Sequence, residues 1–476
     1  MLPLFKDDSS PPSHPLVAVA SGAKPDFHLD GNKVYMISLG CPRNLVDSEV
    51  MLGILLKAGY EAAGDLKEAD YVIINTCGFL EASRQESMDT VEEVLAQRKP
   101  TAKLVVAGCM VQTHQVTLKE KFPGIDYFLG SGDVEGILQA VQSTQKGGIV
   151  TSARSYLEAG EVPRQLSTPK HYAYLKIAEG CRKRCAFCVI PTIKGPLKSK
   201  EKNRVLKEFH LLLDQGVQEI ILIAQDLGDY GKEQGFRRSD GLVDLLKELL
   251  QTEKQFWLRL LYLYPDEITD ELIAVIEQDP RICRYLDMPI QHINDQMLKA
   301  MRRTTNREAI EGTIAKLRER LPEIVIRTSL MVGFPGETEE QFDELCQFVK
   351  KSALDNVGIF KFSREEGSHA YDLADQIPEE VKTERYHQLM RIQKKSVKQR
   401  SQKKWVGKQL PVFVEGYHPE SQLLMRGRHY GQCPEIDGTV IINDGRKVKA
   451  FGKRYLVEIT GVADYDLIGS VIGESA

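Results

Sequence analysis

The chain has 476 residues, of which 42% are hydrophobic and 27% are charged, and its net charge is −4 at pH 7. This length is too great for one ordinary core and predicts about three domains. The small negative charge argues against a basic nucleic-acid surface over the whole molecule, and no apolar run approaches the roughly 20 residues that cross a bilayer. We therefore expect a cytoplasmic protein without a membrane partner.

The first part of the chain predicts a leader, a domain and a linker. Residues 1–31 are rich in Pro and Ser without a long apolar stretch, so we expect a disordered leader rather than a secretory signal. Residues 32–150 alternate β-branched or aromatic runs with amphipathic stretches, which predicts an α/β domain with a parallel sheet. Its strands are expected at 34–39, 71–74, 104–107 and 125–129. Residues 151–170 lack periodicity and are expected to be a linker.

A second series of strands and helices fills residues 171–395. Apolar strands are expected at 172–178, 219–225, 256–264, 285–290, 324–332 and 357–362. Helical patterns lie between them, for example over 242–250 and 338–351. Six such units predict a partial (β/α)6 barrel, short of the eight units of the full form, with its active site at the carboxyl ends of the strands.

The last part of the chain begins with a charged helix over residues 380–404. Short strands with Gly turns follow at 410–414, 422–426, 439–442 and 455–459. We expect a small all-β, OB-like barrel over 396–470. The fold class of the whole chain is therefore α/β, with an added all-β module.

Three cysteines in one short loop predict a metal centre. The nine cysteines favour metal binding or catalysis over disulfides, because cytosolic thiols are kept reduced. Cys181, Cys185 and Cys188 directly follow the first barrel strand and could bind three irons of a 4Fe–4S cluster, which leaves the fourth iron open. That iron could take the amine and carboxylate of S-adenosylmethionine (SAM). A zinc site with a distant fourth ligand is the alternative, which the barrel context and Phe187 disfavour.

Residues at later strand ends are candidate contacts of SAM. Gln225 and Gln291 are polar residues at the carboxyl ends of strands, where a buried core role fits them poorly. Gly333 and Gly336 follow the fifth strand and could let the backbone approach the cofactor closely. The alternative for these glycines is an ordinary turn between a strand and a helix.

Three further cysteines are far apart in the sequence but share one local setting. Cys41, Cys77 and Cys109 each follow a strand and precede a helical pattern. Since the carboxyl ends of parallel strands lie along one sheet edge, the three sulfurs can converge there, and nearby helix N-termini would favour the thiolate. The alternative is three separate buried cysteines. The other three, Cys283, Cys346 and Cys433, are expected in the core.

Together these motifs resemble the radical SAM methylthiotransferases, and the likeness runs from about residue 33 to residue 470. Four stretches resemble the branch that modifies an aspartate of small-subunit ribosomal protein number twelve. They are residues 38–49 (SLGCPRNLVDSE), 75–79 (NTCGF), 287–292 (DMPIQH) and 362–367 (FSREEG). The chain departs from the family at residues 194–200 (KGPLKSK), where Arg is usual and Lys lacks the planar fork of a guanidinium.

The resemblance implies a methylthiotransferase domain over 32–150, a radical SAM barrel over 171–395 and a TRAM domain over 396–470. It implies that Cys41, Cys77 and Cys109 hold an auxiliary 4Fe–4S cluster, and that Cys181, Cys185 and Cys188 hold the cluster that cleaves SAM. The implied reaction abstracts a hydrogen from the β-carbon of the aspartate and transfers a methylthio group from the auxiliary cluster. An electron donor such as flavodoxin or ferredoxin is an implied partner.

Two other functions stay open. The related branch modifies an adenosine of transfer RNA, but residues 410–476 contain seven Lys and Arg against nine Asp and Glu, which fits a phosphate-binding surface poorly. A non-catalytic iron–sulfur carrier would not need the predicted SAM site.

Overall fold

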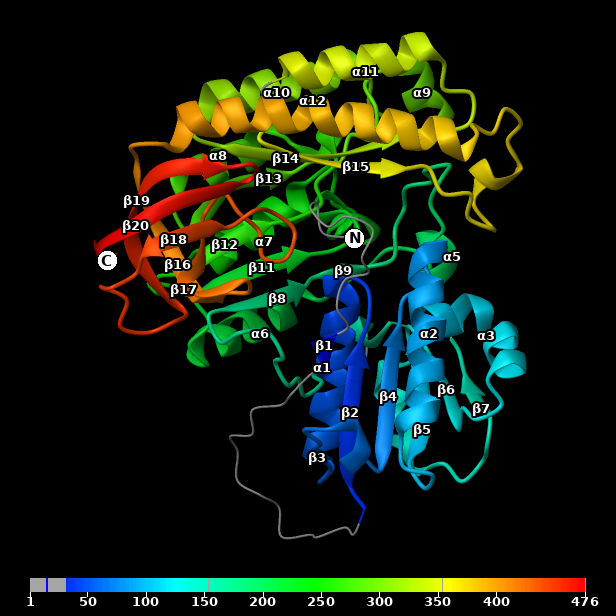
Figure 1. Cartoon of the computed structure of the whole chain (residues 1–476). Helices are drawn as coiled ribbons and strands as arrows, with labels where there is room; N and C mark the ends of the chain where they lie inside the picture. Colours follow the sequence, from blue (N-terminus) through cyan, green and yellow to red (C-terminus); the bar gives the residue numbers. More distant parts are fainter. Residues whose placement is uncertain (1–13, 16–30, 153–154, 159, 353, 476) are drawn as a thin grey trace.

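The computed structural model describes residues 14–15, 31–152, 155–158, 160–352 and 354–475. Figure 1 shows three parts: an N-terminal α/β domain (blue to cyan), a central barrel of strands and helices (green to yellow) and a C-terminal β module (orange to red). The predicted fold class is confirmed. Most of the predicted leader lies outside the described residues, but β1 (His14–Pro15) pairs antiparallel with Ile37 and Ser38.

The N-terminal domain is built on a sheet in the order β1-β2-β4-β5-β6-β7, with β3 paired to β2. Its strands are β2 (Lys33–Ser38), β3 (Glu61–Ala62), β4 (Tyr71–Thr76), β5 (Lys103–Gly108), β6 (Tyr127–Gly130) and β7 (Gly148–Val150). Helices α1 (Pro42–Lys57) and α4 (Ile137–Gln142) cover one face, and α2 (Glu81–Gln97) and α3 (Cys109–Lys121) cover the other. Parallel strands buried on both faces explain the nearly continuous apolar runs in this part of the sequence.

The central part is a parallel six-stranded sheet in the order β15-β14-β13-β12-β11-β8. Its strands are β8 (Tyr172–Lys176), β11 (Glu219–Ile223), β12 (Trp257–Leu260), β13 (Ile282–Asp287), β14 (Val325–Val332) and β15 (Asn356–Lys361). The predicted strand at 285–290 is misplaced: it ends at Asp287, and Pro289 has no N–H to continue the ladder. The edge strands β8 and β15 do not pair among the described residues, so the barrel is partial, as expected.

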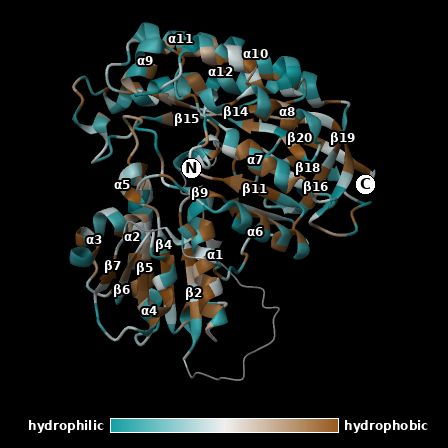
Figure 2. Ribbon diagram, turned by 180° about the vertical axis from the view of Figure 1, so that it is seen from behind, coloured by the Kyte–Doolittle hydropathy of each residue, from teal (hydrophilic) through white to brown (hydrophobic). Residues whose placement is uncertain are grey.

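Helices cover the outside of this sheet. They are α6 (Lys202–Asp214), α7 (Asp240–Leu249), α8 (Asp270–Gln278), α10 (Arg307–Arg320), α11 (Glu339–Lys351) and α12 (Glu379–Trp405), with the short α5 (Ile190–Lys194) and α9 (Asp295–Ala300) near the carboxyl ends of the strands. Figure 2 shows the apolar strands in brown beneath helices with teal outer faces. Within the described part of the chain, no helix combines the length and apolar character of a membrane span.

The C-terminal module is a closed barrel in the order β16-β17-β18-β20-β19. Its strands are β16 (Gln409–His418), β17 (Ser421–His429), β18 (Val440–Asp444), β19 (Lys453–Ala463) and β20 (Asp466–Glu474). Of these, β20 is not among the predicted strands. Phe413 of this module packs in one apolar cluster with Tyr172 and Trp257 of the central sheet, so the module covers the amino-terminal ends of β8 and β12 and leaves the carboxyl ends to the site.

Candidate active site

The compact cysteine loop is held in place by backbone hydrogen bonds to several loops at the carboxyl end of the barrel. The Cys181 N–H donates to the Gly195 carbonyl over 3.3 Å, and the Ala186 N–H donates to the Met301 carbonyl over 3.0 Å. Phe187 packs against an apolar cluster that includes Met297 and Phe334. The loop that carries Cys181, Cys185 and Cys188 is therefore fixed on both sides.

Cys185 has two polar neighbours that the sequence did not predict. Its sulfur lies 2.6 Å from the Tyr264 hydroxyl and 3.7 Å from Nη1 of Arg303. The Arg303 guanidinium also lies 3.7 Å from the centre of the Tyr264 ring, and it is buried. This arrangement places a fixed positive charge and a hydroxyl against one thiolate of the compact triad.

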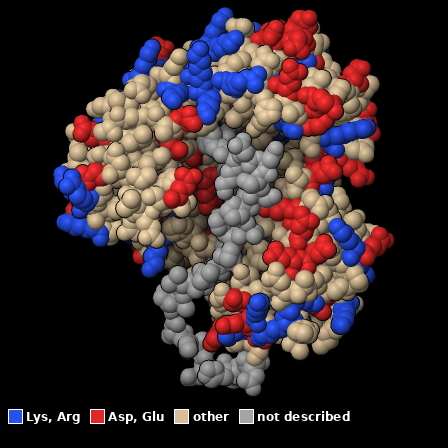
Figure 3. Space-filling model, in the orientation of Figure 1, with Lys and Arg blue, Asp and Glu red and all other residues tan. Residues whose placement is uncertain are grey.

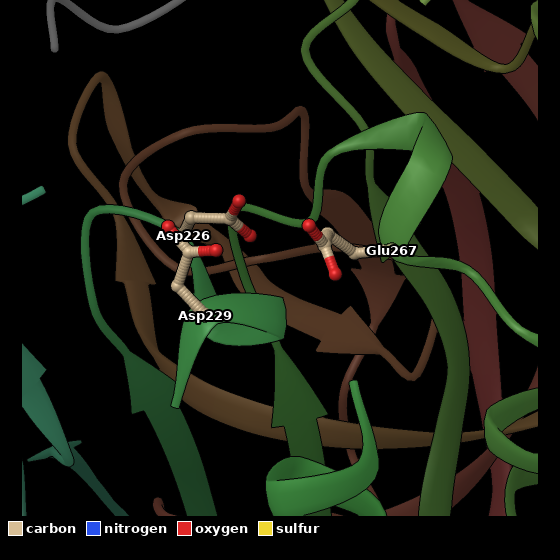
Figure 4. Close-up of side chains that lie close together, drawn as sticks. All are labelled: Asp226, Asp229 and Glu267. Carbon is tan, nitrogen blue, oxygen red and sulfur yellow. The ribbon is translucent and has the colours of Figure 1, made fainter. Parts of the chain in front are cut away.

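A buried acidic cluster anchors the middle of the same loop. Figure 4 shows Asp226, Asp229 and Glu267 converging from the loops after β11 and β12. Lys183 lies between Cys181 and Cys185 in the sequence, and its ammonium group lies 2.8 Å from Glu267 and 3.4 Å from Asp226. Burial raises the pKa of Asp226, and the positive charge of Lys183 offsets only part of this rise.

The acidic cluster does not present a free metal site. Lys183 is one cation among its carboxylates, and Lys232 is a second, paired with Asp229 over 2.8 Å and with Glu267. Two ammonium groups therefore occupy the space that a cation would need. The cluster binds the cysteine loop to the barrel through Lys183.

The dispersed cysteines converge at the carboxyl edge of the N-terminal sheet. Cys41 caps the start of α1, Cys77 follows β4, and Cys109 is the first residue of α3. At Gly40, where φ is +90°, a Cβ would lie 2.7 Å from Cβ of Cys77, and at Gly78 one would lie 2.8 Å from the Met110 nitrogen, next to Cys109. The three loops therefore touch one another, and glycine is needed where they meet.

Buried amides hold this edge together. The Asn44 side chain donates to the Leu39 carbonyl over 2.7 Å, and the Asn75 side chain donates to the Asn44 carbonyl and to the Ser48 hydroxyl, both over 2.8 Å. These bonds join the first turn of α1 to the end of β4. They fix Cys41 relative to Cys77.

The pKa of Cys41 differs from those of other thiols in both triads. Burial alone would raise the pKa of Cys41, but the Arg43 guanidinium lowers it to about 7. Burial raises the pKa of Cys109 to about 12, that of Cys188 to about 12 and that of Cys181 to about 11. The expectation that helix N-termini favour all three thiolates of the dispersed triad is wrong for Cys77 and Cys109, because burial raises the pKa of both thiols.

The described structure does not bring either triad to the close spacing of a single zinc ion. Zn–S bonds of about 2.3 Å bring the sulfurs of a zinc site to within about 3.8 Å of one another. Among the described residues, neither cysteine triad brings all three sulfurs within 4.8 Å. The thiols of each triad nevertheless act on one another electrostatically. Wider triads of converging thiols suit a multi-iron cluster.

The predicted SAM contacts follow the carboxyl ends of β11, β13 and β14, in different environments. Gln225 follows β11, and its side-chain oxygen is buried without a hydrogen-bond partner among the described residues. Gln291 has φ of +72° and bridges to Leu330. Gly333 packs against Lys382 and donates its N–H to Glu337 over 2.7 Å, whereas Gly336 lies in an exposed turn.

Ion pairs dock the N-terminal domain on the barrel. Lys194 lies 2.8 Å from Glu179 and 3.2 Å from Asp47 of α1, so Lys rather than Arg at this position makes an interdomain contact. Glu365 accepts from Arg84 over 2.6 Å. The remaining cysteines, Cys283, Cys346 and Cys433, are buried in apolar clusters as expected.

Three family models match successive parts of the chain. The model described as "Uncharacterized protein family UPF0004" matches residues 33–130, the radical SAM superfamily matches residues 175–349, and the TRAM domain matches residues 406–472. The dispersed triad lies in the first match and the compact triad in the second. Each matched part therefore coincides with one part of the fold.

Curated relatives match almost the whole chain. One from Protochlamydia amoebophila, named ribosomal protein uS12 methylthiotransferase RimO, is 70% identical over 99% of this chain and 100% of its own length. Proteins of the same name from Chlamydia abortus and Bdellovibrio bacteriovorus are 57% and 46% identical, each over 93% of this chain and over 96% and 98% of their own lengths.

A solved structure shares the fold at low identity. The radical S-adenosylmethionine methyltransferase TsrM from Kitasatospora setae superposes with a TM-score of 0.51 at 17% identity, over 69% of this chain and 72% of that one. At this identity the likeness concerns the fold alone.

Proposed function

Because the chain belongs to the RimO family of radical SAM methylthiotransferases, we propose that it adds a methylthio group to the β-carbon of an aspartate of ribosomal protein uS12. The observation that carries this proposal is the pair of cysteine triads, one dispersed along the edge of the N-terminal sheet and one compact on the facing barrel. Arg43 of the N-terminal domain bonds the Ala224 carbonyl of the barrel over 3.0 Å, so the two triads share one interior.

We assign an auxiliary 4Fe–4S cluster to Cys41, Cys77 and Cys109, and the SAM-binding 4Fe–4S cluster to Cys181, Cys185 and Cys188. When bound, the clusters and SAM would pass on an electron from a donor protein and would supply the radical, the sulfur and its methyl group. Of the predicted SAM contacts, we propose Gln225 and Gln291 as direct ones, because Gly333 has already donated its N–H to Glu337. Gly333 and Gly336 shape the turn beside them.

The chain's own residues orient and shield the chemistry. Arg303 and Tyr264 hold Cys185, and the Lys183 ion pairs keep the loop on the barrel rim. Phe187, Phe334 and neighbouring apolar side chains exclude water beside the compact loop, which protects a reactive intermediate from side reactions.

The charge distribution supports a basic protein as substrate. Figure 3 shows Asp and Glu side chains in the middle of one face, where the barrel meets the N-terminal domain, while the helices at the top carry Lys and Arg at the centre and Asp and Glu at the right. A ribosomal protein rich in basic residues complements such an acidic surround.

We propose a cytoplasmic reaction in which a small acidic carrier, flavodoxin or ferredoxin, supplies electrons. Arg182 and Arg184 support this partner, because both are exposed on the compact loop beside the cluster ligands. Exposed cations of one sign steer an anionic partner toward that loop.

Mass spectrometry of ribosomal protein uS12 and of transfer RNA from a strain that lacks the protein tests the function. We expect uS12 to lose one methylthio group and to regain it when the wild-type gene is restored, while the transfer RNA stays unchanged. Loss of a methylthio group from a transfer-RNA adenosine instead would favour the other branch, and no change in either would contradict the enzymatic proposal.

A further inference from the structure

Arg43 is half-buried and, within the described part of the chain, has no carboxylate partner, a feature that it shares with the buried Arg303 but not with other buried arginines of the barrel. Arg259, Arg327 and Arg385 pair with Glu219, Asp287 and Glu337 at 2.7, 2.6 and 2.6 Å. Among the described residues, by contrast, no carboxylate lies within ion-pair distance of Arg43. Its Nη1 lies 3.0 Å from the Ala224 carbonyl, its guanidinium carbon lies 5.2 Å from the centre of the Tyr262 ring, and its guanidinium also interacts with the Cys41 sulfur.

The position of Arg43 lies between the two cysteine triads. It follows Cys41 by two residues in the first turn of α1, and Ala224 and Tyr262 bring its guanidinium to the carboxyl ends of β11 and β12. Tyr262 lies two residues before Tyr264, whose hydroxyl lies 2.6 Å from the sulfur of Cys185 in the compact triad. A group held by Arg43 would therefore lie near both triads.

Two hydroxyls at the same end of the barrel also lack partners. The hydroxyls of Tyr262, whose ring Arg43 contacts, and of Ser329 are buried, and neither bonds to another described residue. They lie after β12 and in the carboxyl-terminal half of β14. Since buried polar groups are normally hydrogen-bonded, this interior suits a polar guest.

We propose that Arg43 binds the side-chain carboxylate of the target aspartate and so holds its β-carbon between the two triads. This inference rests on the proposed function. A guanidinium presents a planar fork that matches a carboxylate with two parallel hydrogen bonds. The β-carbon is bonded directly to the carboxylate carbon, so fixing the carboxylate also fixes the reacting position. A cation–π contact with the Tyr262 ring, 5.2 Å from the guanidinium carbon, helps to hold the guanidinium in place.

A double-mutant cycle between enzyme and substrate tests this role. Binding of purified uS12 to the enzyme loaded with both clusters is measured for wild type and R43Q, with the target residue as Asp or as Asn. Asp→Asn is expected to weaken binding to wild type by about tenfold or more, because close interfacial charge pairs couple at this level. In R43Q the same change is expected to cost less than about threefold.

Matched variants keep the test decisive. R98Q removes another guanidinium of the same domain, paired with Asp126 at 3.0 Å, and should discriminate Asp from Asn as wild type does. If R43Q cannot be loaded with both clusters, as judged by iron content and electron paramagnetic resonance, R43K replaces it. Lys keeps the charge without the planar fork. The ratio of the affinities of R43K for the Asp and Asn forms of uS12 should therefore be at least about threefold smaller than that of wild type.

Two results separate this inference from the proposed function. An equal Asp→Asn effect in wild type and in the Arg43 variants would overturn the carboxylate contact, and an altered cluster spectrum with that result would assign Arg43 to the auxiliary cluster alone. Wild-type enzyme that leaves uS12 unmodified would instead contradict the proposed function.

Discussion

The two cysteine triads each bring three thiols together, but they are built from different kinds of backbone structure. The compact triad is one loop, fixed by backbone bonds and by the Lys183 ion pairs. The dispersed triad is assembled from three strand ends whose loops touch at Gly40 and Gly78. The first depends on local sequence, while the second depends on the register of a parallel sheet. We therefore expect the dispersed site to be the more sensitive to changes in backbone packing.

The two triads also share one structural feature, an arginine that lies over a tyrosine ring. The guanidinium carbon of Arg43 lies 5.2 Å from the centre of the Tyr262 ring, and that of Arg303 lies 3.7 Å from the centre of the Tyr264 ring. Both tyrosines follow β12, so one loop supports a guanidinium for each site. The difference lies in the partners, because Arg303 bonds Cys185 and the carbonyl of Pro289, whereas Arg43 reaches across a domain boundary.

Substitution of one glycine beside each site should have the largest effect of the changes considered. Gly40→Ala places a Cβ 2.7 Å from Cβ of Cys77 at φ of +90°, and Gly180→Ala drives one into the Pro196 carbonyl oxygen at φ of +73°. Each change adds strain of about 1–3 kcal/mol before the clash. We expect each variant to lose about half of its iron and all methylthio product, as measured by iron analysis and mass spectrometry.

A glycine with open space around it is the control for this pair. Gly59 has φ of +94°, and nothing lies within 4 Å of the place that a Cβ would take, so Gly59→Ala carries the strain without the clash. An equal loss of iron in Gly59→Ala would show that backbone strain, rather than contact between the loops, decides cluster binding.

Removing Lys183 should destabilise the compact site. Lys183→Met leaves Asp226, Asp229 and Glu267 with one cation instead of two, and breaking a buried ion pair costs about 3 kcal/mol. Urea unfolding followed by the fluorescence of Trp257 and Trp405 measures this loss. Lys202→Met, which breaks an exposed pair with Asp244, should cost less than about 1 kcal/mol. Equal losses of unfolding free energy in the two variants would show that Lys183 does not anchor the loop.

The Arg303 guanidinium at the compact site should increase the rate of SAM cleavage. Arg303→Gln removes a hydrogen bond from a charged donor to Cys185, worth about 1.5–3 kcal/mol, and should slow formation of 5′-deoxyadenosine by about 10–100-fold. The neighbouring Arg302 is exposed and bonds His369, so Arg302→Gln is the matched control. An unchanged rate in Arg303→Gln would exclude a role in cleavage.

The thiols should differ in alkylation rate, which is the smallest expected effect. The pKa of Cys41 is about 7, so at pH 7.5 much of it is thiolate, whereas the pKa of Cys181 is about 11. In metal-free protein, a short iodoacetamide pulse should label Cys41 at least about tenfold faster than Cys181, and the labelling rate of Cys41 should fall below pH 7 as its thiol becomes protonated. Arg43→Gln should abolish the preference for Cys41. Faster labelling of Cys181 would contradict this charge assignment.

Much of this architecture could be predicted from the sequence, for physical reasons. The apolar runs of β4 and β5 are buried on both faces, and the three cysteines at one sheet edge follow from parallel strand order. The spacing of the compact triad is local. The strand β20 was missed because its short apolar runs are interrupted by Gly469 and Gly473.

The other differences arise from contacts between distant segments. Arg303 meets Cys185 only through the fold, and no spacing in the sequence pairs them. Lys183 meets Glu267 in the same way. The thiol acidities differ from expectation because burial, which a sequence does not show, raises the pKa of Cys77 and of Cys109.

The most direct test of the two-site account is the yield of 5′-deoxyadenosine from Cys77→Ala and Cys185→Ala, each reduced in the presence of SAM. We predict that Cys77→Ala still cleaves SAM but forms no methylthio product, because its compact triad is intact. Cys185→Ala should do neither. Loss of SAM cleavage in Cys77→Ala, with electron paramagnetic resonance showing that the cluster at Cys181, Cys185 and Cys188 is retained, would contradict separate roles for the two triads.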